Sequence, residues 1–133
     1  MKIGLHLSDL TYPSGPGGLA DDLTHIVVAA EEAGFARVSV MDHVWQIAVH
    51  GPPEHDMLEA YTTLGYIAAR TNRVDLVAWV TAVSYRPPER TSRVLTSLAS
   101  MPGVARHRRG LERRGSGGAR ARLSAAGAAV RDA

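Results

Sequence analysis

Hydrophobic and polar residues follow two different periods along the first part of the chain. Apolar residues take every second position in residues 2–7, which predicts a short strand. From Leu19 they recur every three or four residues, with acidic residues on the other side, which predicts an amphipathic helix. Gly34 suits the left-handed position that ends a helix, and Phe35 can fold back as its hydrophobic contact.

The same two periods return further along the sequence. Residues 37–42 predict a second strand, and a helical stripe follows a Gly-Pro-Pro breaker, with Asp56 as its expected N-cap. A nearly continuous apolar run over residues 74–83 predicts a strand buried on both faces, and a third helix is expected from Arg90. The β-α-β-α-β order predicts right-handed crossovers and a parallel sheet covered by helices, an α/β fold.

Several stretches of this pattern together resemble one known family. Residues 38–45 read VSVMDHVW, residues 51–64 read GPPEHDMLEAYTTL, and residues 77–83 read VAWVTAV, followed by Tyr85-Arg86-Pro87-Pro88. As a set they resemble the luciferase-like monooxygenase superfamily, especially its deazaflavin-using branch, in which a strand ends in Asp-His and a helix begins Leu-Glu-Ala-Tyr. The resemblance implies that residues 1–98 are the N-terminal portion of a TIM (β/α) barrel.

The resemblance also implies a chemistry. The expected function is that of an oxidoreductase, either hydride transfer or monooxygenation of a small-molecule substrate with the deazaflavin coenzyme F-420. An FMN-dependent monooxygenase is the alternative within the same class. A barrel of this kind closes with eight strands, and this sequence predicts three, so we expect an incomplete barrel that is inactive as this chain. Its open strand edges favour self-association, which is compatible with a homo-oligomer.

Polar residues fall where the predicted strands end. Barrel enzymes place their chemistry at the C-terminal ends of strands, and His6, Asp42 and His43 lie there. We expect His43 to transfer a proton or to hydrogen-bond the substrate, because imidazole titrates near neutral pH. Asp42 is expected to orient His43 or to meet the cofactor ring. The alternative for His43 is a purely structural bond to a backbone carbonyl.

The resemblance adds further site residues. It implies that Thr81, Ala82 and Val83 form the bed of the cofactor ring, with a non-prolyl cis peptide between Ala82 and Val83. His6 and Trp45 are expected to contact substrate, although Trp45 is equally suited to fill a gap between helices and barrel.

Two further features have plain structural interpretations. Arg86 is expected to solvate its loop rather than to bind a cofactor phosphate. His50, Glu54, His55 and Asp56 contain metal-ligating groups, but they lie in a Pro-broken loop without helical spacing, so no metal is expected.

Composition limits the cellular context. Cysteine is absent, which removes disulfides and thiol chemistry and favours an intracellular, cytoplasmic protein. No apolar stretch reaches the length needed to span a membrane, so no membrane association is expected.

The charge distribution divides the chain at residue 98. Residues 1–98 hold seven Lys and Arg against eleven Asp and Glu, whereas residues 99–133 hold eight Arg against two acids, within a formal net charge of +2. We expect two parts, the partial barrel over 1–98 and a basic, disordered tail over 99–133. A basic-tailed nucleic-acid-binding protein is an alternative of another class, but it is disfavoured because no aromatic residue is interleaved with the Arg cluster.

The tail also has an origin that can be tested on paper. With permitted codons for residues 103–117, the frame offset by one nucleotide reads AWPGIGAAWNDEEA. This is close to the fourth-strand segment that the family resemblance implies should follow. We therefore expect the tail to come from a frameshifted gene product.

Overall fold

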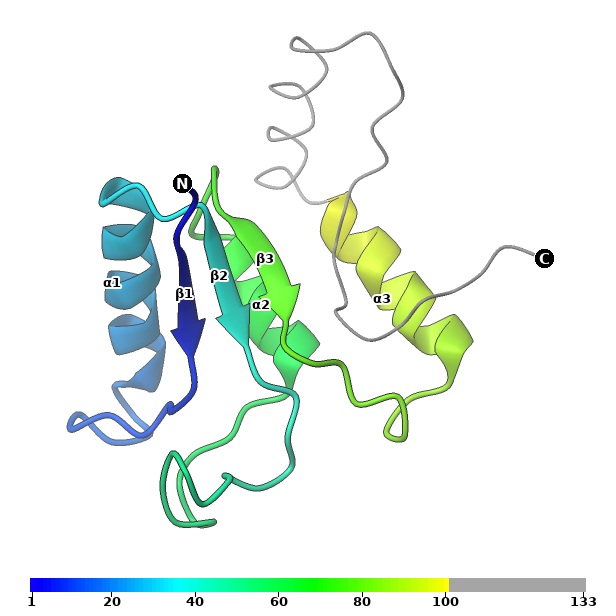
Figure 1. The fold of residues 1–133 in the computed structure, drawn as a ribbon, viewed down its shortest axis with the longest axis horizontal. Helices are drawn as coiled ribbons and strands as arrows, with labels where there is room; N and C mark the ends of the chain where they lie inside the picture. Colours follow the sequence, from blue (N-terminus) through cyan, green and yellow to red (C-terminus); the bar gives the residue numbers. More distant parts are fainter. Residues whose placement is uncertain (101–133) are drawn as a thin grey trace, which may run out of the picture.

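Three parallel strands form the sheet of this protein, of which the computed structural model describes residues 1–100 (Figure 1). The strands are β1 (Gly4–Leu7), β2 (Arg37–Val40) and β3 (Asp75–Ala78), in the spatial order β1-β2-β3. In this register Leu7 lies beside Val40, and Val40 beside Ala78. The parallel β-α-β-α-β topology predicted from the two periods is therefore confirmed.

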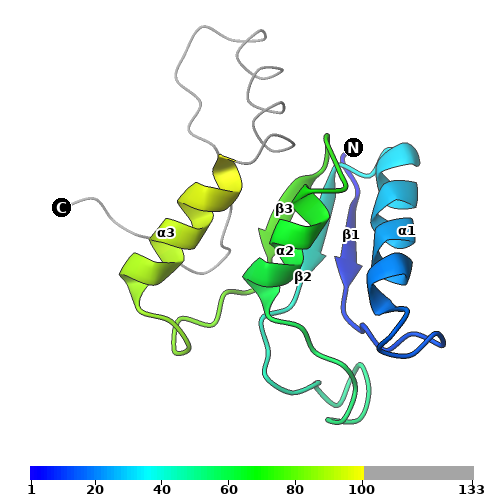
Figure 2. The ribbon, with the colours of Figure 1, turned by 180° about the vertical axis from the view of Figure 1, so that it is seen from behind.

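Helices α1 (Leu19–Glu32) and α2 (Ala60–Ala68) cover one face of the sheet, and α3 (Pro88–Ala99) stands beyond β3 (Figures 1 and 2). The core lies between the sheet and helices α1 and α2. Its largest fully buried side chains are Leu23, Val27, Val38, Val40, Leu64 and Ile67. Burying a side chain of this size contributes roughly 1.5–3 kcal/mol, so this layer is the main source of stability in the described residues.

The end of α1 follows the sequence prediction closely. Gly34 has a φ of 85°, a conformation that a side chain would disfavour. The Gly34 N–H donates to the Glu31 carbonyl at 3.2 Å, and the Phe35 N–H donates to the Ala30 carbonyl at 3.0 Å. These two bonds satisfy carbonyls at the end of the helix and turn the chain into β2.

The start of α2 differs from its prediction. Glu59, and not Asp56, is the N-cap, and its carboxylate accepts the Thr62 N–H at 2.6 Å. Asp56 lies in the preceding loop, where its backbone N–H donates to the Thr11 hydroxyl at 2.8 Å. The predicted cap was wrong because a contact between two loops holds the Asp56 segment outside the helix. Helix α3 also begins two residues earlier than predicted, with Pro88 in its first turn, where no N–H partner is needed.

Strand β3 is shorter than its apolar run suggests. The last ladder partner of β3 is Val40, whose carbonyl accepts the Trp79 N–H at 2.8 Å, and β2 extends no further. Beyond this point Trp79 is 53% exposed and Val80 46% exposed, so the prediction of a fully buried strand over 74–83 was wrong for its second half. The non-prolyl cis peptide joins Trp79 to Val80, which corrects the expected position between Ala82 and Val83.

The structure describes residues 1–100 only, so it bears on the membrane prediction within this range and does not bear on the predictions for the tail. Within residues 1–100, none of the helices has the length and apolar character to cross a bilayer. Three predictions concern the C-terminal segment: the basic tail, the nucleic-acid alternative and the shifted reading frame. Apart from residues 99 and 100, that segment lies outside the part of the chain that the structure describes.

Candidate active site

The loops that follow the three strands lie at one edge of the sheet, because all three strands point the same way (Figure 1). His6 lies within β1 near its end, Asp42 and His43 follow β2, and Thr81 to Val83 follow β3. The predicted site residues are thus placed at the C-terminal edge, as the barrel interpretation requires.

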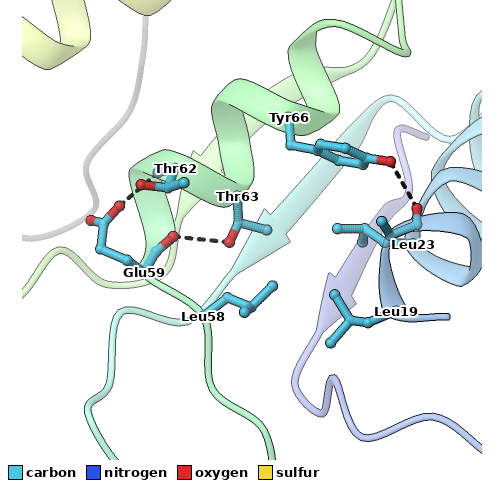
Figure 3. Close-up of a pocket in the computed structure, with 8 residues that line it drawn as sticks. Leu19, Leu23, Leu58, Glu59, Thr62, Thr63 and Tyr66 are labelled. Atoms are coloured by element: carbon cyan, nitrogen blue, oxygen red, sulfur yellow. Dashed lines mark hydrogen bonds between the residues drawn. The ribbon is translucent and has the colours of Figure 1, made fainter. Parts of the chain in front are cut away.

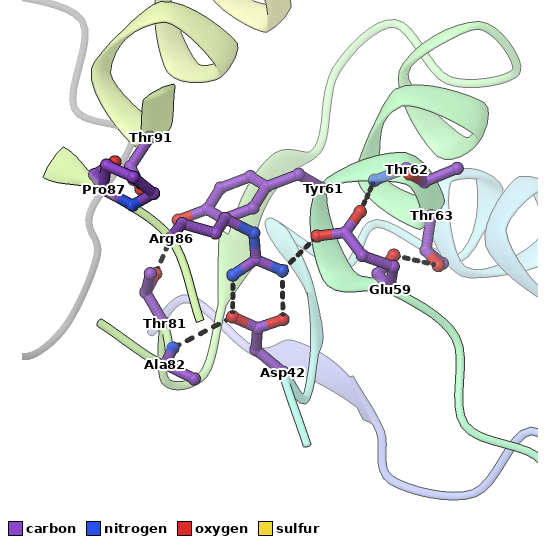
Figure 4. A network of polar contacts seen from close by, with 10 residues as sticks. All are labelled: Asp42, Glu59, Tyr61, Thr62, Thr63, Thr81, Ala82, Arg86, Pro87 and Thr91. Carbon is purple, nitrogen blue, oxygen red and sulfur yellow. Dashed lines mark hydrogen bonds and ion pairs between the residues drawn. The ribbon is translucent and has the colours of Figure 1, made fainter. Parts of the chain in front are cut away.

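Asp42 is the centre of a buried network at this edge (Figure 4). The Arg86 guanidinium donates to both of its carboxylate oxygens, at 2.5 Å and 2.8 Å, and the Ala82 N–H donates to one of them at 2.9 Å. The side chains are little exposed, 3% for Asp42 and 13% for Arg86. A two-point bond of this geometry is among the stronger polar contacts in proteins. It fixes the loop after β3 against the end of β2.

Helix α2 contributes a second layer to the same network. Glu59, the N-cap of α2, forms an ion pair with Arg86. Tyr61 lies beneath the Arg86 guanidinium, which is 5.0 Å from the ring centre, and its hydroxyl is 2.6 Å from that of Thr81. Arg86 therefore links the ends of β2, β3 and α2 through one planar group.

The network sets the charge of its members. Burial alone would raise the pKa of Asp42, but the hydrogen bonds from Arg86 and from the Ala82 N–H outweigh it, so this pKa lies below its ordinary value. Burial likewise opposes ionisation of Glu59, while bonds from Thr62 and the charge of Arg86 lower its pKa. The bond to Asp42 raises the pKa of Arg86 further above its already high value. All three groups are charged at neutral pH.

This geometry corrects the expected role of Arg86 and the expected contact between Asp42 and His43. Arg86 does not simply solvate its loop, because its guanidinium is committed to two carboxylates. Asp42 directs its oxygens at Arg86 and Ala82, so no bond from Asp42 orients His43. His43 is half-buried and has no hydrogen bond to another residue in the described part of the chain, including the backbone carbonyl bond of the structural alternative. The catalytic assignment of both residues stays a prediction.

Large apolar side chains gather around the same edge. Trp79, Val80 and Val83 are 53%, 46% and 70% exposed at and beyond the end of β3, and Trp45 after β2 is 70% exposed. Trp45 therefore does not fill a gap among the described residues, while its role in a substrate pocket stays a prediction. An apolar surface of this kind fits the flat ring of a flavin or deazaflavin. Arg86 does not offer a free charge to the phosphate of such a cofactor, because Asp42 and Glu59 already neutralise its guanidinium.

His6 is placed on β1 facing the neighbouring strand. Its Nδ1 lies 2.9 Å from the hydroxyl of Ser39, which in turn lies 3.3 Å from the Leu5 carbonyl. Burial lowers the pKa of His6, with a smaller contribution in the same direction from the charge of His50. A largely neutral His6 suits hydrogen bonding to a substrate, and this role stays a prediction.

An apolar cleft lies elsewhere, between α1 and α2 (Figure 3). It has a volume of about 200 Å³ and an almost wholly apolar wall that includes Leu19, Leu23 and Leu58. The Tyr66 hydroxyl donates to the Ala20 carbonyl at 2.9 Å and so joins the two helices beside it. This cleft belongs to the helical layer and not to the strand ends.

Sequence reasoning missed a second hydrogen-bonded pair of polar side chains at the strand-end edge. Nδ1 of His55 lies 2.9 Å from a carboxylate oxygen of Asp9, and the other oxygen accepts the Thr11 N–H at 2.9 Å. In the sequence alone, His55 stands out only as a potential metal ligand. Among residues 1–100 there is no group of three or more His, Asp or Glu arranged to hold a metal ion. The signal that could have revealed the pair is topological, because Asp9 and His55 lie in loops that follow neighbouring parallel strands.

The comparisons with known proteins agree with this arrangement. A sequence model of the luciferase-like monooxygenases matches residues 1–103. The chain belongs to this family. No curated protein matches it.

Solved structures share the fold. The monooxygenase RslO1 from Streptomyces bottropensis superposes with a TM-score of 0.62 at 24% identity, over 80% of this chain and 31% of that one. The oxygenating constituent of 3,6-diketocamphane monooxygenase from Pseudomonas putida, a type II Baeyer-Villiger monooxygenase in complex with FMN, gives 0.61 at 15% identity, over 80% and 28%. The chain thus spans less than a third of the length of each of these two structures.

Proposed function

We propose that this chain supplies three βα units and one side of the active-site mouth of a luciferase-like oxidoreductase. The cofactor we propose is the deazaflavin coenzyme F-420, with FMN as the alternative, and the substrate is a small molecule. The observation that carries the proposal is the exposed apolar surface of Trp79, Val80 and Val83, adjoining the polar strand ends in a chain of this family. FMN gains support from one structural relative, which is described as an FMN complex.

Each site residue predicted from the sequence receives a role in this proposal. Thr81, Ala82 and Val83 form the ring bed, and Asp42 holds that bed in place through the Ala82 N–H. His43 transfers a proton or hydrogen-bonds the substrate, because it is half-buried and unpaired among the described residues. His6 and Trp45 contact the substrate. When bound, the cofactor itself supplies the redox chemistry.

The proposal includes weak binding by the 133-residue chain alone. Phosphate groups of such cofactors need cations or free backbone amides, and within residues 1–100 the guanidinium at this edge, that of Arg86, is already held by Asp42 and Glu59. Each missing charge-assisted hydrogen bond costs about 1.5–3 kcal/mol, so losing two or three reduces affinity by several orders of magnitude. We also propose a cytoplasmic location and self-association through open strand edges.

Fluorescence titrations with FMN and with the deazaflavin test the proposal directly. For the 133-residue chain, the Kd for each cofactor is expected to lie above about 1 µM, because contacts to the phosphate groups are lacking. The product of the frame offset by one nucleotide after residue 103 is expected to bind one of them at least about 100-fold more tightly. In that product Val83→Asp places a charge in the ring bed and is expected to abolish binding, whereas Val49→Asp, at an exposed loop position, is the control.

The outcomes separate the parts of the proposal. Sub-micromolar binding by the 133-residue chain would show that it retains a working site and refute the proposed weakness. Equal, weak binding by the frame-offset product would contradict the assignment of the mouth to a flavin-type cofactor. The coding DNA beyond codon 103, where the family match ends, shows whether the offset frame continues the barrel.

A further inference from the structure

The loops after β1 and β2 are joined side by side at the mouth. Three hydrogen bonds connect them, namely Gln46 Nε2 to the Ser8 carbonyl at 2.9 Å, His55 Nδ1 to Asp9 at 2.9 Å, and the Asp56 N–H to the Thr11 hydroxyl at 2.8 Å. Of these groups, only the imidazole of His55 can both accept and release a proton near neutral pH. The connection therefore contains one candidate for proton transfer.

The surroundings of Asp9 determine which nitrogen of His55 carries the proton. One carboxylate oxygen of Asp9 accepts the Thr11 N–H and the other faces Nδ1 of His55. The bond from the Thr11 N–H is the main cause that lowers the pKa of Asp9, so this carboxyl is ionised at neutral pH. An ionised carboxylate only accepts hydrogen bonds, so Nδ1 must be the donor. In the neutral ring Nε2 then keeps its lone pair, and none of the described residues binds it.

The ring is also held by its packing. A Cβ built on Gly51 would lie 2.5 Å from Nδ1 and 2.7 Å from the neighbouring ring carbon of His55, so only glycine permits this position of the imidazole. The His55 side chain nevertheless remains 31% exposed. An imidazole with a fixed tautomer, a defined position and open access matches the arrangement in which a carboxylate prepares a histidine as a general base.

We propose that His55, prepared by Asp9, is a second proton-accepting imidazole of the mouth, directed at a hydroxyl group of the substrate. The proposal rests on the proposed function, because it names a substrate class for the same site. In the step, the O–H bond breaks with its electron pair left on oxygen, and a new N–H bond forms with the lone pair of Nε2. The resulting imidazolium is stabilised by the adjacent carboxylate of Asp9.

The tautomer can be measured on the 133-residue chain without cofactor. Long-range proton–nitrogen correlation spectra distinguish the protonated from the unprotonated ring nitrogen. In the neutral ring of His55, Nδ1 is expected to be the protonated nitrogen and Nε2 the free one. A spectrum that shows Nε2–H, or an even mixture of both forms, overturns the proposal.

Asp9→Asn gives a sharper second measurement. The side-chain oxygen of asparagine keeps the Thr11 N–H, which turns its NH₂ group toward His55. Nδ1 must then accept, and the proton moves to Nε2. We expect the two nitrogen signals to exchange character in this variant and to remain unchanged in the control His50→Gln, an exposed histidine of the same loop. Unchanged signals in Asp9→Asn would overturn the proposal, since Asp9 would then not be the group that sets the tautomer of His55.

Chemical labelling provides a test that does not depend on any variant folding. Diethylpyrocarbonate modifies unprotonated, accessible imidazole nitrogens, and peptide mass spectrometry locates the label. His55 is expected to react at Nε2 in the wild-type chain. Absence of the label at His55 under conditions that label exposed His50 overturns the proposal. Neither measurement involves cofactor, so a failure here is distinguishable from a failure of the flavin titrations.

Discussion

Two clusters of polar side chains lie at the same edge of the sheet and differ in what they leave available for chemistry. In the first cluster, the Arg86 guanidinium forms ion pairs with two carboxylates, those of Asp42 and Glu59. The side chains of Asp42 and Arg86 are only 3% and 13% exposed. Around His55 the pair with Asp9 leaves one ring nitrogen open, and both side chains are about a third exposed. The first cluster holds three elements in place, whereas the second leaves a group available for chemistry.

The largest expected effect comes from removing Arg86. In Arg86→Met, Asp42 is left buried without its partner, and the expected loss is about 3–5 kcal/mol in the free energy of unfolding. Urea denaturation followed by far-ultraviolet circular dichroism measures this loss. Arg90→Met, at an exposed position of α3, is the matched control and should change stability by less than about 0.5 kcal/mol. Similar losses in the two variants would mean that the Arg86 network does not stabilise the fold.

Acid should weaken the same cluster. The pKa of Asp42 is lowered in the folded chain from its ordinary value of 3.8, so its stabilising contribution is complete above that value and is lost as the pH falls through the folded pKa. Asp42→Asn removes this contribution. The difference in unfolding free energy between wild type and Asp42→Asn should therefore shrink as the pH falls from the ordinary value of 3.8 into the more acidic range. A difference that stays constant over this range would contradict the lowered pKa.

Glu59 should have an intermediate effect. Its side chain is 45% exposed, and a glutamine could still accept the Thr62 N–H. Glu59→Gln is therefore expected to cost about 1 kcal/mol, chiefly through the lost ion pair with Arg86. Thermal unfolding of the variant beside wild type measures it, with Glu54→Gln, in the exposed loop before α2, as the control. A loss as large as that of Arg86→Met would show that Asp42 is not the main partner.

The smallest coupling is expected between Asp9 and His55. A double-mutant cycle with alanine at both positions should give less than about 1 kcal/mol, because solvent screens a pair that is a third exposed. The same cycle across Asp42 and Arg86 should give a clearly larger value. Equal coupling energies would remove the distinction between the two clusters.

Sequence patterns were sufficient for the elements that local rules determine. The period of α1 and the left-handed Gly34 specified where that helix ends, and the three strands follow from alternation and apolar runs. The length of β3 was not accessible in this way, because it is set by where β2 stops offering ladder partners beyond Val40. Local propensity alone would have continued the strand to Val83.

The site was predictable in its position and less so in its contacts. Parallel topology placed Asp42, His43 and Thr81 to Val83 at one edge, where the structure has them. The pairing of Asp42 with Arg86 joins residues 44 positions apart, and that of Asp9 with His55 joins residues 46 apart. Such pairs depend on the exact path of three loops, which neither periodicity nor composition specifies.

The positions of the tryptophans have a practical consequence for spectroscopy. The chain contains two, Trp45 and Trp79, and both side chains are more than half exposed at the mouth. Their emission in the folded state should already resemble that of tryptophan in water, so unfolding of the core will change it little. A ligand that covers the mouth, in contrast, should shift or quench the whole signal. Intrinsic fluorescence of this protein is thus a reporter of occupancy at the strand ends, while the folding of the core needs a different probe.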